Sequence, residues 1–207
     1  GFSSIPLQLA DKEGDGTSDT FIAITAGANH ALAIHGASAT AEFGQIYAWG
    51  RNSEGQLGLG HKNAVGGLRL LNGGQLWRVV EAGVHSSFAL DSSSKLYAWG
   101  LGSFGSLGLG DTAGTAIQQT SSPTLTSNST NSSIVYENVS AGADHTLAVA
   151  SGGGAIYGTG VKAGLAATDT GGASRYTEFT LLNFDLPSGA SVDAVGAGLD
   201  YSIIALD

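Results

Sequence analysis

Tyr-Ala-Trp-Gly at residues 97–100, followed by Gly-Ser-Leu-Gly-Leu-Gly at 105–110, decides how this chain is organised. The same pair of motifs occurs at residues 47–50 and 55–60, and a reduced copy, Tyr-Gly-Thr-Gly, lies at 157–160. Motifs that recur in the same order mark an internal repeat, in which each copy is one structural unit. We call residues 55–60 and 105–110 the glycine–leucine loops.

A second motif, Ala-Gly, recurs once in each unit, in a constant order relative to the first motif. Its copies start at Ala26, Ala82, Ala141 and Ala197, which are 56, 59 and 56 residues apart. A nearly constant period of this length is typical of stacked or circular arrays. The sequence therefore predicts a single array over residues 1–207, with units near 21–75, 76–133 and 134–190 and a partial unit at 191–207.

Each unit has the pattern of a small antiparallel sheet. In the first unit we expect strands at 21–26, 30–34 and 45–49, the first two joined by Gly-Ala-Asn, residue types that favour tight turns. A fourth, weaker strand is expected in each connection. Short four-stranded sheets repeated along a chain are typical of propeller blades. We predict an all-β fold, a β-propeller of four-stranded blades with about three and a half blades in this chain.

The later units repeat this pattern with weaker signals. Predicted strands lie at 76–81, 95–99, 135–140, 145–149, 155–157, 179–184, 191–195 and 202–206, with a second hairpin at 82–90. The third unit has Thr159 where the others have Trp, so we expect less bulk there. Residues 61–75 and the polar stretch 111–133 are predicted as loops, the latter as a mobile or binding loop.

Residues 24–34 and 139–149 resemble the signature of the regulator-of-chromosome-condensation repeat family, as do the Tyr-Ala-Trp-Gly motif and the glycine–leucine loops. The likeness is close over 21–110 and looser over 134–206. It implies a seven-bladed propeller, of which this chain would supply half. The absence of Met suggests a processed chain or a fragment. The low number of units suggests a fragment, a half-propeller completed by another chain or copy, or a shortened propeller that has lost its remaining blades.

The residues that define the repeat are predicted to be structural. They are His30, Trp49, Gly50, Trp99, Gly100 and His145. The histidine position holds Ser86 in the second unit and Tyr201 in the fourth, which argues against shared histidine chemistry. Gly100–Gly105 matches the dinucleotide pattern G-x-G-x-x-G, but no helical pattern follows it, so the repeat explains it better.

Composition narrows the classes of function. The formal net charge is −9, and the eight basic residues are scattered, which disfavours nucleic acid as a partner. Cysteine is absent, which excludes disulfides and thiolate metal sites, and no apolar run is long enough to span a membrane. No catalytic motif is present, so we expect neither an enzyme nor a required cofactor. The compartment is left open.

One acidic segment suggests a metal site. Asp11, Glu13, Asp15 and Asp19 surround a glycine much as in the first half of a calcium loop. The twelfth position counted from Asp11 is Ile22 rather than Glu, and no flanking helix is indicated. A solvated turn and a calcium-binding loop both remain as interpretations.

Three functions follow from these observations. The first is a non-enzymatic protein–protein interaction scaffold, a subunit or fragment working within a larger complex. It would contact partners through blade loops and open strand edges. The second, implied by the resemblance, is guanine-nucleotide exchange on a small GTPase. The third is a calcium-stabilised binding module.

Overall fold

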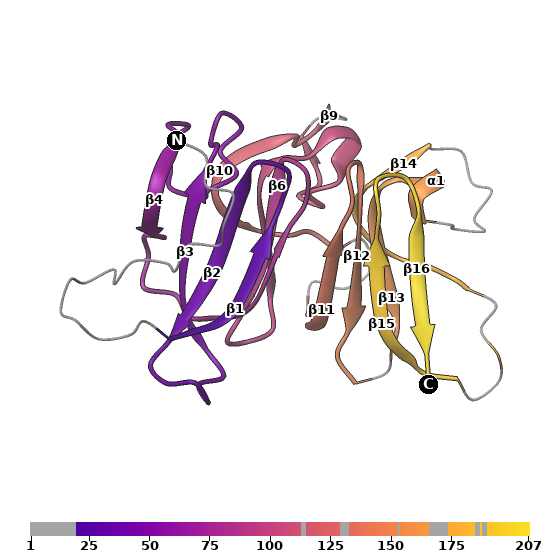
Figure 1. Cartoon of the computed structure of the whole chain (residues 1–207). Coiled ribbons are helices and arrows are strands. Elements are labelled where there is room, and N and C mark those ends of the chain that lie inside the picture. Colours follow the sequence, from indigo (N-terminus) through magenta and orange to yellow (C-terminus); the bar gives the residue numbers. More distant parts are fainter. Residues whose placement is uncertain are drawn as a thin grey trace, which may run out of the picture.

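The computed structural model describes residues 20–112, 115–128, 133–152, 154–165, 174–184, 187 and 190–207. The described chain is almost entirely antiparallel β-structure, with blades that follow one another from the N-terminal to the C-terminal side (Figure 1). The first blade contains β1 (Phe21–Ala26), β2 (His30–Gly36), β3 (Gly44–Gly50) and β4 (Val65–Leu70). The second contains β5 (Trp77–Ala82), β6 (Ser86–Asp91), β7 (Leu96–Leu101) and β10 (Gln119–Leu125).

The C-terminal half continues the same arrangement. The third blade contains β11 (Tyr136–Ala141), β12 (His145–Ala150), β13 (Ile156–Val161) and β14 (Arg175–Leu181). A final two-stranded sheet pairs β15 (Val192–Ala197) with β16 (Ser202–Leu206). The short elements are β8 (Asp111–Thr112), β9 (Thr115–Ala116), the 3₁₀ turn Ser103–Gly105 and α1 (Lys162–Leu165). The fold is thus a partial propeller, as the repeat pattern predicted.

Each blade is built in the same way. The second and third strands pair without interruption, for example from His30↔Gly50 to Gly36↔Gly44. The first strand of every sheet has an irregularity near its start, as at Phe21/Ala23 and Val192/Ala194. Such bulges bend a strand and increase its twist. The four first strands therefore enter their blades with one shared distortion, although their sequences differ.

Two connections were predicted as loops with a fourth, weaker strand expected in each, and they contain the fourth strands of the first two blades. β4 lies within 61–75 and pairs with β3, and β10 lies within 111–133 and pairs with β7. Because each is the outer strand of its blade and has one neighbour, most of its side chains are partly or fully exposed. Thr, Ser and Gly are tolerated at such an edge, and this is why the polar composition suggested a loop. Residues 113–114 and 129–132 lie outside the described part.

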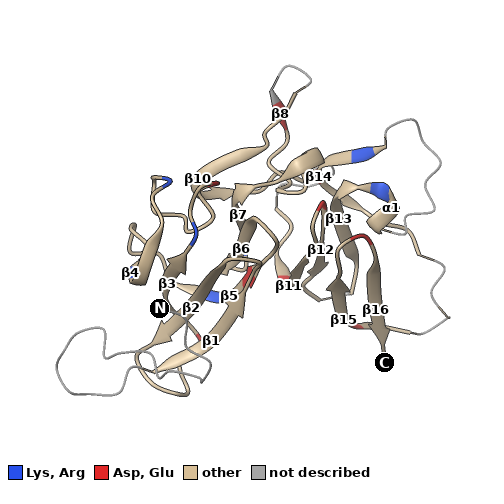
Figure 2. Cartoon of the chain, turned by 45° about the horizontal axis from the view of Figure 1, so that its top comes forward, with Lys and Arg blue, Asp and Glu red and all other residues tan. Residues whose placement is uncertain are grey.

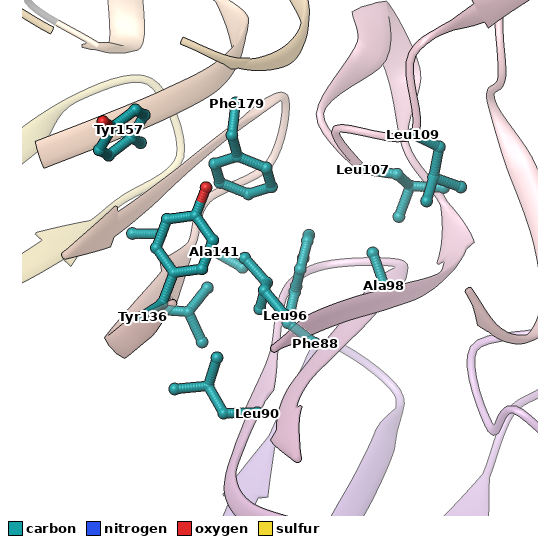
Figure 3. Packing of buried hydrophobic residues seen from close by; sticks show 12 residues of the cluster. Phe88, Leu90, Leu96, Ala98, Leu107, Leu109, Tyr136, Ala141, Tyr157 and Phe179 are labelled. Carbon is teal, nitrogen blue, oxygen red and sulfur yellow. The ribbon is translucent and has the colours of Figure 1, made fainter. Parts of the chain in front are cut away.

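The hydrophobic cores lie between blades rather than within them. One core packs the first blade against the second, with Leu32, Ile34 and Leu57 on one side and Trp77 and Trp99 on the other. A second core lies between the second and third blades, where Phe88 and Leu96 approach Tyr136 and Ala141 (Figure 3). A third core joins the third blade to β15 and β16. Each blade is therefore stabilised by its neighbours.

The third blade replaces its missing tryptophan from another strand. Thr159 occupies the position of Trp99, and we predicted less bulk in this blade. Phe179 of β14 fills the space instead and is fully buried against the second glycine–leucine loop. A Cβ on Gly108 would lie 2.5 Å from the Phe179 ring, much as a Cβ on Gly58 would lie 2.8 Å from Trp99. The predicted loss of bulk was wrong, because the compensating ring comes from β14.

Candidate interaction site

Each blade binds a loop of the blade before it, and these contacts show which groups a blade face can hold. The first glycine–leucine loop lies against the second blade, and one of its carbonyl oxygens receives two hydrogen bonds. Trp99 Nε1–H donates to the backbone oxygen of Gln56 at 2.9 Å, and Ser87 Oγ–H donates to the same oxygen at 2.8 Å. Leu57 is fully buried beside them. The loop is thus held by both polar and apolar contacts.

The same arrangement recurs at the next two junctions. Thr146 Oγ1–H donates to Ser106 O at 2.9 Å, and Thr159 Oγ1–H donates to Gly105 O at 2.9 Å. At the last junction, Ser202 Oγ–H donates to the backbone oxygen of Gly164. A hydroxyl from the second strand of each following blade therefore bonds the loop of the blade before it.

His30 and His145 lie at these junctions. The Nε2 atom of His30 is 2.9 Å from Ser87 Oγ, and that of His145 is 3.0 Å from Ser202 Oγ. Each serine donates its single proton to a loop carbonyl, so the histidine Nε2 carries a proton and donates it to the serine. Burial lowers the pKa of His30 to about 4 and also lowers the pKa of His145. Both imidazoles are therefore neutral at pH 7.

A second set of bonds joins the first strands. The N–H of Ala82 donates to Thr25 Oγ1 at 3.1 Å, that of Ala141 lies 3.4 Å from Glu81 Oε1, and that of Ala197 donates to Ser140 Oγ at 3.0 Å. Burial is the main cause that raises the pKa of Glu81. These three side chains occupy one repeat position, so the inner strands are linked from blade to blade.

The Ala-Gly motifs meet at one end of the inner strands. They line a shared hollow of about 250 Å³ with residues of all four units. A Cβ on Gly27 would collide with the carbonyl oxygen of Gly83, and one on Gly142 would collide with that of Gly198. Glycine is needed in this motif because the turns of adjacent blades approach backbone to backbone.

The other predicted repeat residues lie at the blade faces. Gly50 and Gly100 have φ of +106° and +94°, a conformation that favours glycine. Trp99 is fully buried between the first two blades, whereas Trp49 lies on the outward face of the first blade and is only partly buried. The dinucleotide-like stretch contains the 3₁₀ turn Ser103–Gly105, in which Gly105 lies against Tyr176 and Thr177 of the third blade whereas Phe104 is exposed.

The predicted calcium ligands Asp11, Glu13, Asp15 and Asp19 lie outside the described residues, so this site stays a prediction. Within the described ranges, no three His, Asp or Glu side chains gather in a way that could hold a metal ion. The described helices include none that is long and apolar enough to cross a membrane. The described Lys and Arg residues are distributed over several blades (Figure 2).

Sequence reasoning missed four residues that hold the junctions together, namely Ser87, Thr146, Ser202 and Asn52. The first three follow the histidine position directly, and a hydroxyl at that place in three of four units was a usable signal. Asn52 is fully buried, accepts the N–H of Leu57 at 2.9 Å, and donates to the backbone oxygens of His61 and Asn63. It shapes the first glycine–leucine loop and has no counterpart in the second unit, where Gly102 stands.

Comparison with known proteins agrees with this geometry. The family model of the regulator of chromosome condensation (RCC1) repeat matches residues 44–90 and 93–149, together half of the chain. The chain belongs to the RCC1 repeat family. The matched segments include both glycine–leucine loops and the β12 strand that carries His145.

Solved RCC1-type structures have the same fold. Yeast RCC1 (Prp20), solved bound to Kap60, is 21% identical, with a TM-score of 0.69 over 91% of this chain and 42% of that one. Human WBSCR16 is 21% identical, with a TM-score of 0.69 over 86% of this chain and 42% of that one. Prp20p from Saccharomyces cerevisiae, described with its binding properties to Gsp1p and histones, is 22% identical, with a TM-score of 0.69 over 93% and 44%. The chain thus spans less than half the length of these relatives.

The fourth unit exposes a face that the other blades bury. Ile203 is 62% exposed, whereas Leu32, Phe88 and Leu147 at the same repeat position are all 0% exposed. Tyr201 is 58% exposed, whereas His30 at its position is 4% exposed. Within the described residues, β16 pairs only with β15, while β2, β6 and β12 each have a third strand on this edge. Among the described residues, β16 therefore has an apolar face and a strand edge that no other segment covers.

Proposed function

We propose that this chain is a non-enzymatic protein–protein interaction scaffold that works within a larger complex. The observation that carries the proposal is that, among the described residues, Tyr201 and Ile203 beside the edge of β16 are exposed where other blades bury the same positions. An unpaired strand edge is a template for another strand. The partner would add an extended segment along β16 and cover Ile203, as β7 and the third blade do for β6 and Phe88.

The edge of β16 would contribute both binding free energy and sequence specificity to such a complex. Burying a side chain the size of Ile contributes about 1.5–3 kcal/mol. Leu199, at the turn before β16, is also exposed, at 68%. Main-chain hydrogen bonds along the edge would fix the direction of the added strand, and the alternating side chains would select its sequence. The blade loops at 61–75 and 111–133 remain further candidate contact surfaces.

Site-specific photo-crosslinking tests this function. A photoreactive amino acid at position 203 should yield a discrete adduct from native extract, identified by mass spectrometry. The same amino acid at the exposed Ser92, on the β6–β7 turn, is the matched control. A partner that is enriched at position 203 and lost when the neighbouring exposed Tyr201 is also replaced by Asp supports the proposal. Equal, diffuse crosslinking at both positions would overturn it.

Guanine-nucleotide exchange on a small GTPase is the second candidate. Its support is the shared fold with Prp20p, whose binding to Gsp1p has been described. A bound GTPase would have to contact a propeller face in a way that weakens its hold on nucleotide. Release of labelled nucleotide from candidate GTPases, measured with and without the purified chain, decides this point: unchanged release rates would remove the hypothesis.

A further inference from the structure

A cavity of about 230 Å³ lies between the second and third blades, and we call it the junction cavity. Lys95 and Leu96 line it from the second blade, at the start of β7. Tyr136 of β11 and Glu178 of β14 line it from the third. The connection that follows β10 contributes residues 126–128. Both walls of the cavity therefore belong to the described part of this chain.

The junction cavity has the size of a small organic molecule. A cavity of about 150 Å³ is enough for benzene. Three aliphatic side chains form the apolar part of its lining, and they differ in exposure: Leu96 is buried, Ile134 is partly buried and Leu125 is 53% exposed. This part of the cavity is suited to an aliphatic group, and the side of Leu125 is open to solvent.

The hydroxyl of Tyr136 is a hydrogen-bond donor at this cavity. The Tyr136 ring packs in the core between the two blades and is 3% exposed (Figure 3). Its oxygen accepts a hydrogen bond from Asn128 Nδ2–H at 2.8 Å. Burial raises the pKa of Tyr136 to about 12, so the hydroxyl keeps its own proton at pH 7. No described residue accepts that proton. Because buried donors are normally paired, an oxygen atom of a ligand would complete this group.

The junction cavity also has one group of each charge, on different blades. Lys95 contributes an ammonium group, which donates to the backbone oxygen of Ile134 at 3.3 Å. Glu178 contributes a carboxylate that makes no hydrogen bond or ion pair with a described residue. A bridge between Leu109 and Glu178 fixes the backbone at this position. A positive wall and a negative wall are thus held on either side of an apolar surface.

We propose that the junction cavity binds a free amino acid with an aliphatic side chain. The carboxylate of the ligand would lie between Lys95 and the Tyr136 hydroxyl, and its ammonium group would lie against Glu178. Its side chain would pack on Leu96 and Ile134. A few placed polar groups in an apolar cavity are the usual way in which proteins orient a small ligand. The site is separate from the edge of β16, and its ligand would contact two blades at once.

The two charges set the specificity of the cavity. A carboxylic acid with the same carbon skeleton would leave Glu178 without a cation. An amine with that skeleton would leave Lys95 and the Tyr136 hydroxyl without an anion. Each of these molecules lacks one charge-assisted hydrogen bond and should bind more weakly than the amino acid.

Amide NMR spectra of the isotopically labelled chain test the site, with L-leucine as the probe. Isocaproate, which lacks the ammonium group of leucine, and isopentylamine, which lacks the carboxylate, are the control molecules. We expect saturable shifts with L-leucine at the amides of Lys95, Asn128 and Glu178. Each control molecule should bind roughly tenfold more weakly, because it has lost one charge-assisted contact.

Glu178→Gln keeps the shape of the side chain and removes its charge. It should weaken L-leucine binding roughly tenfold and leave isocaproate binding unchanged. Glu137→Gln, at an exposed acid on β11, is the matched control and should bind L-leucine as the unaltered chain does. Equal binding of the three molecules by the unaltered chain, or no saturable shift with L-leucine, would overturn the proposal. Neither result changes the crosslinks at position 203, so the two proposals fail separately.

Discussion

At the scale of single residues, glycine and histidine stabilise the junctions between blades for different reasons. Gly58 is required because its neighbour is a ring face and its φ is +72°. His30 is required because its neutral Nε2–H donates to Ser87 Oγ in a buried place. Glycine allows the close approach because it has no side chain, and histidine can be buried because it is uncharged.

Gly58→Ala should destabilise the protein by roughly 1–3 kcal/mol, because it adds a methyl group against Trp99 and forces an unfavourable backbone conformation. Gly66→Ala is the matched control, since a Cβ at Gly66 has nothing within 4 Å. Urea unfolding followed by tryptophan fluorescence measures both free energies of unfolding. If the two variants were equally stable, the close approach of Gly58 to Trp99 would not contribute to folding.

His30 should make the free energy of unfolding depend on pH. Its pKa is about 4 in the folded chain and 6.5 in the reference state, so the unfolded chain binds more protons between these values. The contribution is fully present above pH 6.5 and falls as pH drops toward 4, by at most about 3 kcal/mol. His30→Gln should flatten the stability profile over this window in urea titrations. Parallel profiles for the two proteins would contradict this origin.

At the scale of elements, the second and fourth strands of the blades differ in how strongly the sequence specifies them. β2, β6 and β12 are buried on both faces, and their apolar runs predicted them correctly. β4 and β10 have one neighbour each, and the glycines of β4 and the polar side chains of β10 gave only a weak strand pattern. The bulk that Phe179 supplies for Thr159 could not be predicted, because the two residues meet only through the β13–β14 pairing.

The junctions between blades could also be predicted from the sequence only in part. Variation at the histidine position suggested a shared place in each unit without shared chemistry. The hydroxyls of Ser87, Thr146 and Ser202 were visible in the alignment of the units, but their acceptors were not. Those acceptors are backbone carbonyls of the preceding blade, and a carbonyl has no sequence signature.

Phe179→Ala should cost about 3–5 kcal/mol, because it leaves a cavity beside Gly108 in a fully buried core. Phe104→Ala, at a side chain that is 48% exposed, should cost much less. Thr159→Trp should also destabilise through overpacking, and Phe179→Ala should relieve that effect in the double variant. Additive effects of the two substitutions in urea unfolding would show that they do not share one space.

At the scale of the whole molecule, the three hydrophobic cores of the described residues lie between blades, so the stability of the array is approximately a sum over junctions. The second blade lies between two complete junctions, with Phe88, Ala89 and Leu90 fully buried. The β15–β16 sheet has one junction and an exposed outer face. The described chain is therefore most stable in its middle and least stable at its C-terminal sheet, where the proposed partner would bind.

Hydrogen exchange should reveal this gradient. Among the second strands of the units, amides of β16 should exchange fastest and those of β6 slowest. The reason is that a strand between two buried junctions opens less often than a strand beside one. Ser202→Ala removes the bond to Gly164 and the acceptor of His145, at about 1 kcal/mol for each bond. It should speed exchange in β15 and β16 and leave β6 unchanged. Equal acceleration in all blades would mean that the chain unfolds as one cooperative unit, and the independence of its junctions would be wrong.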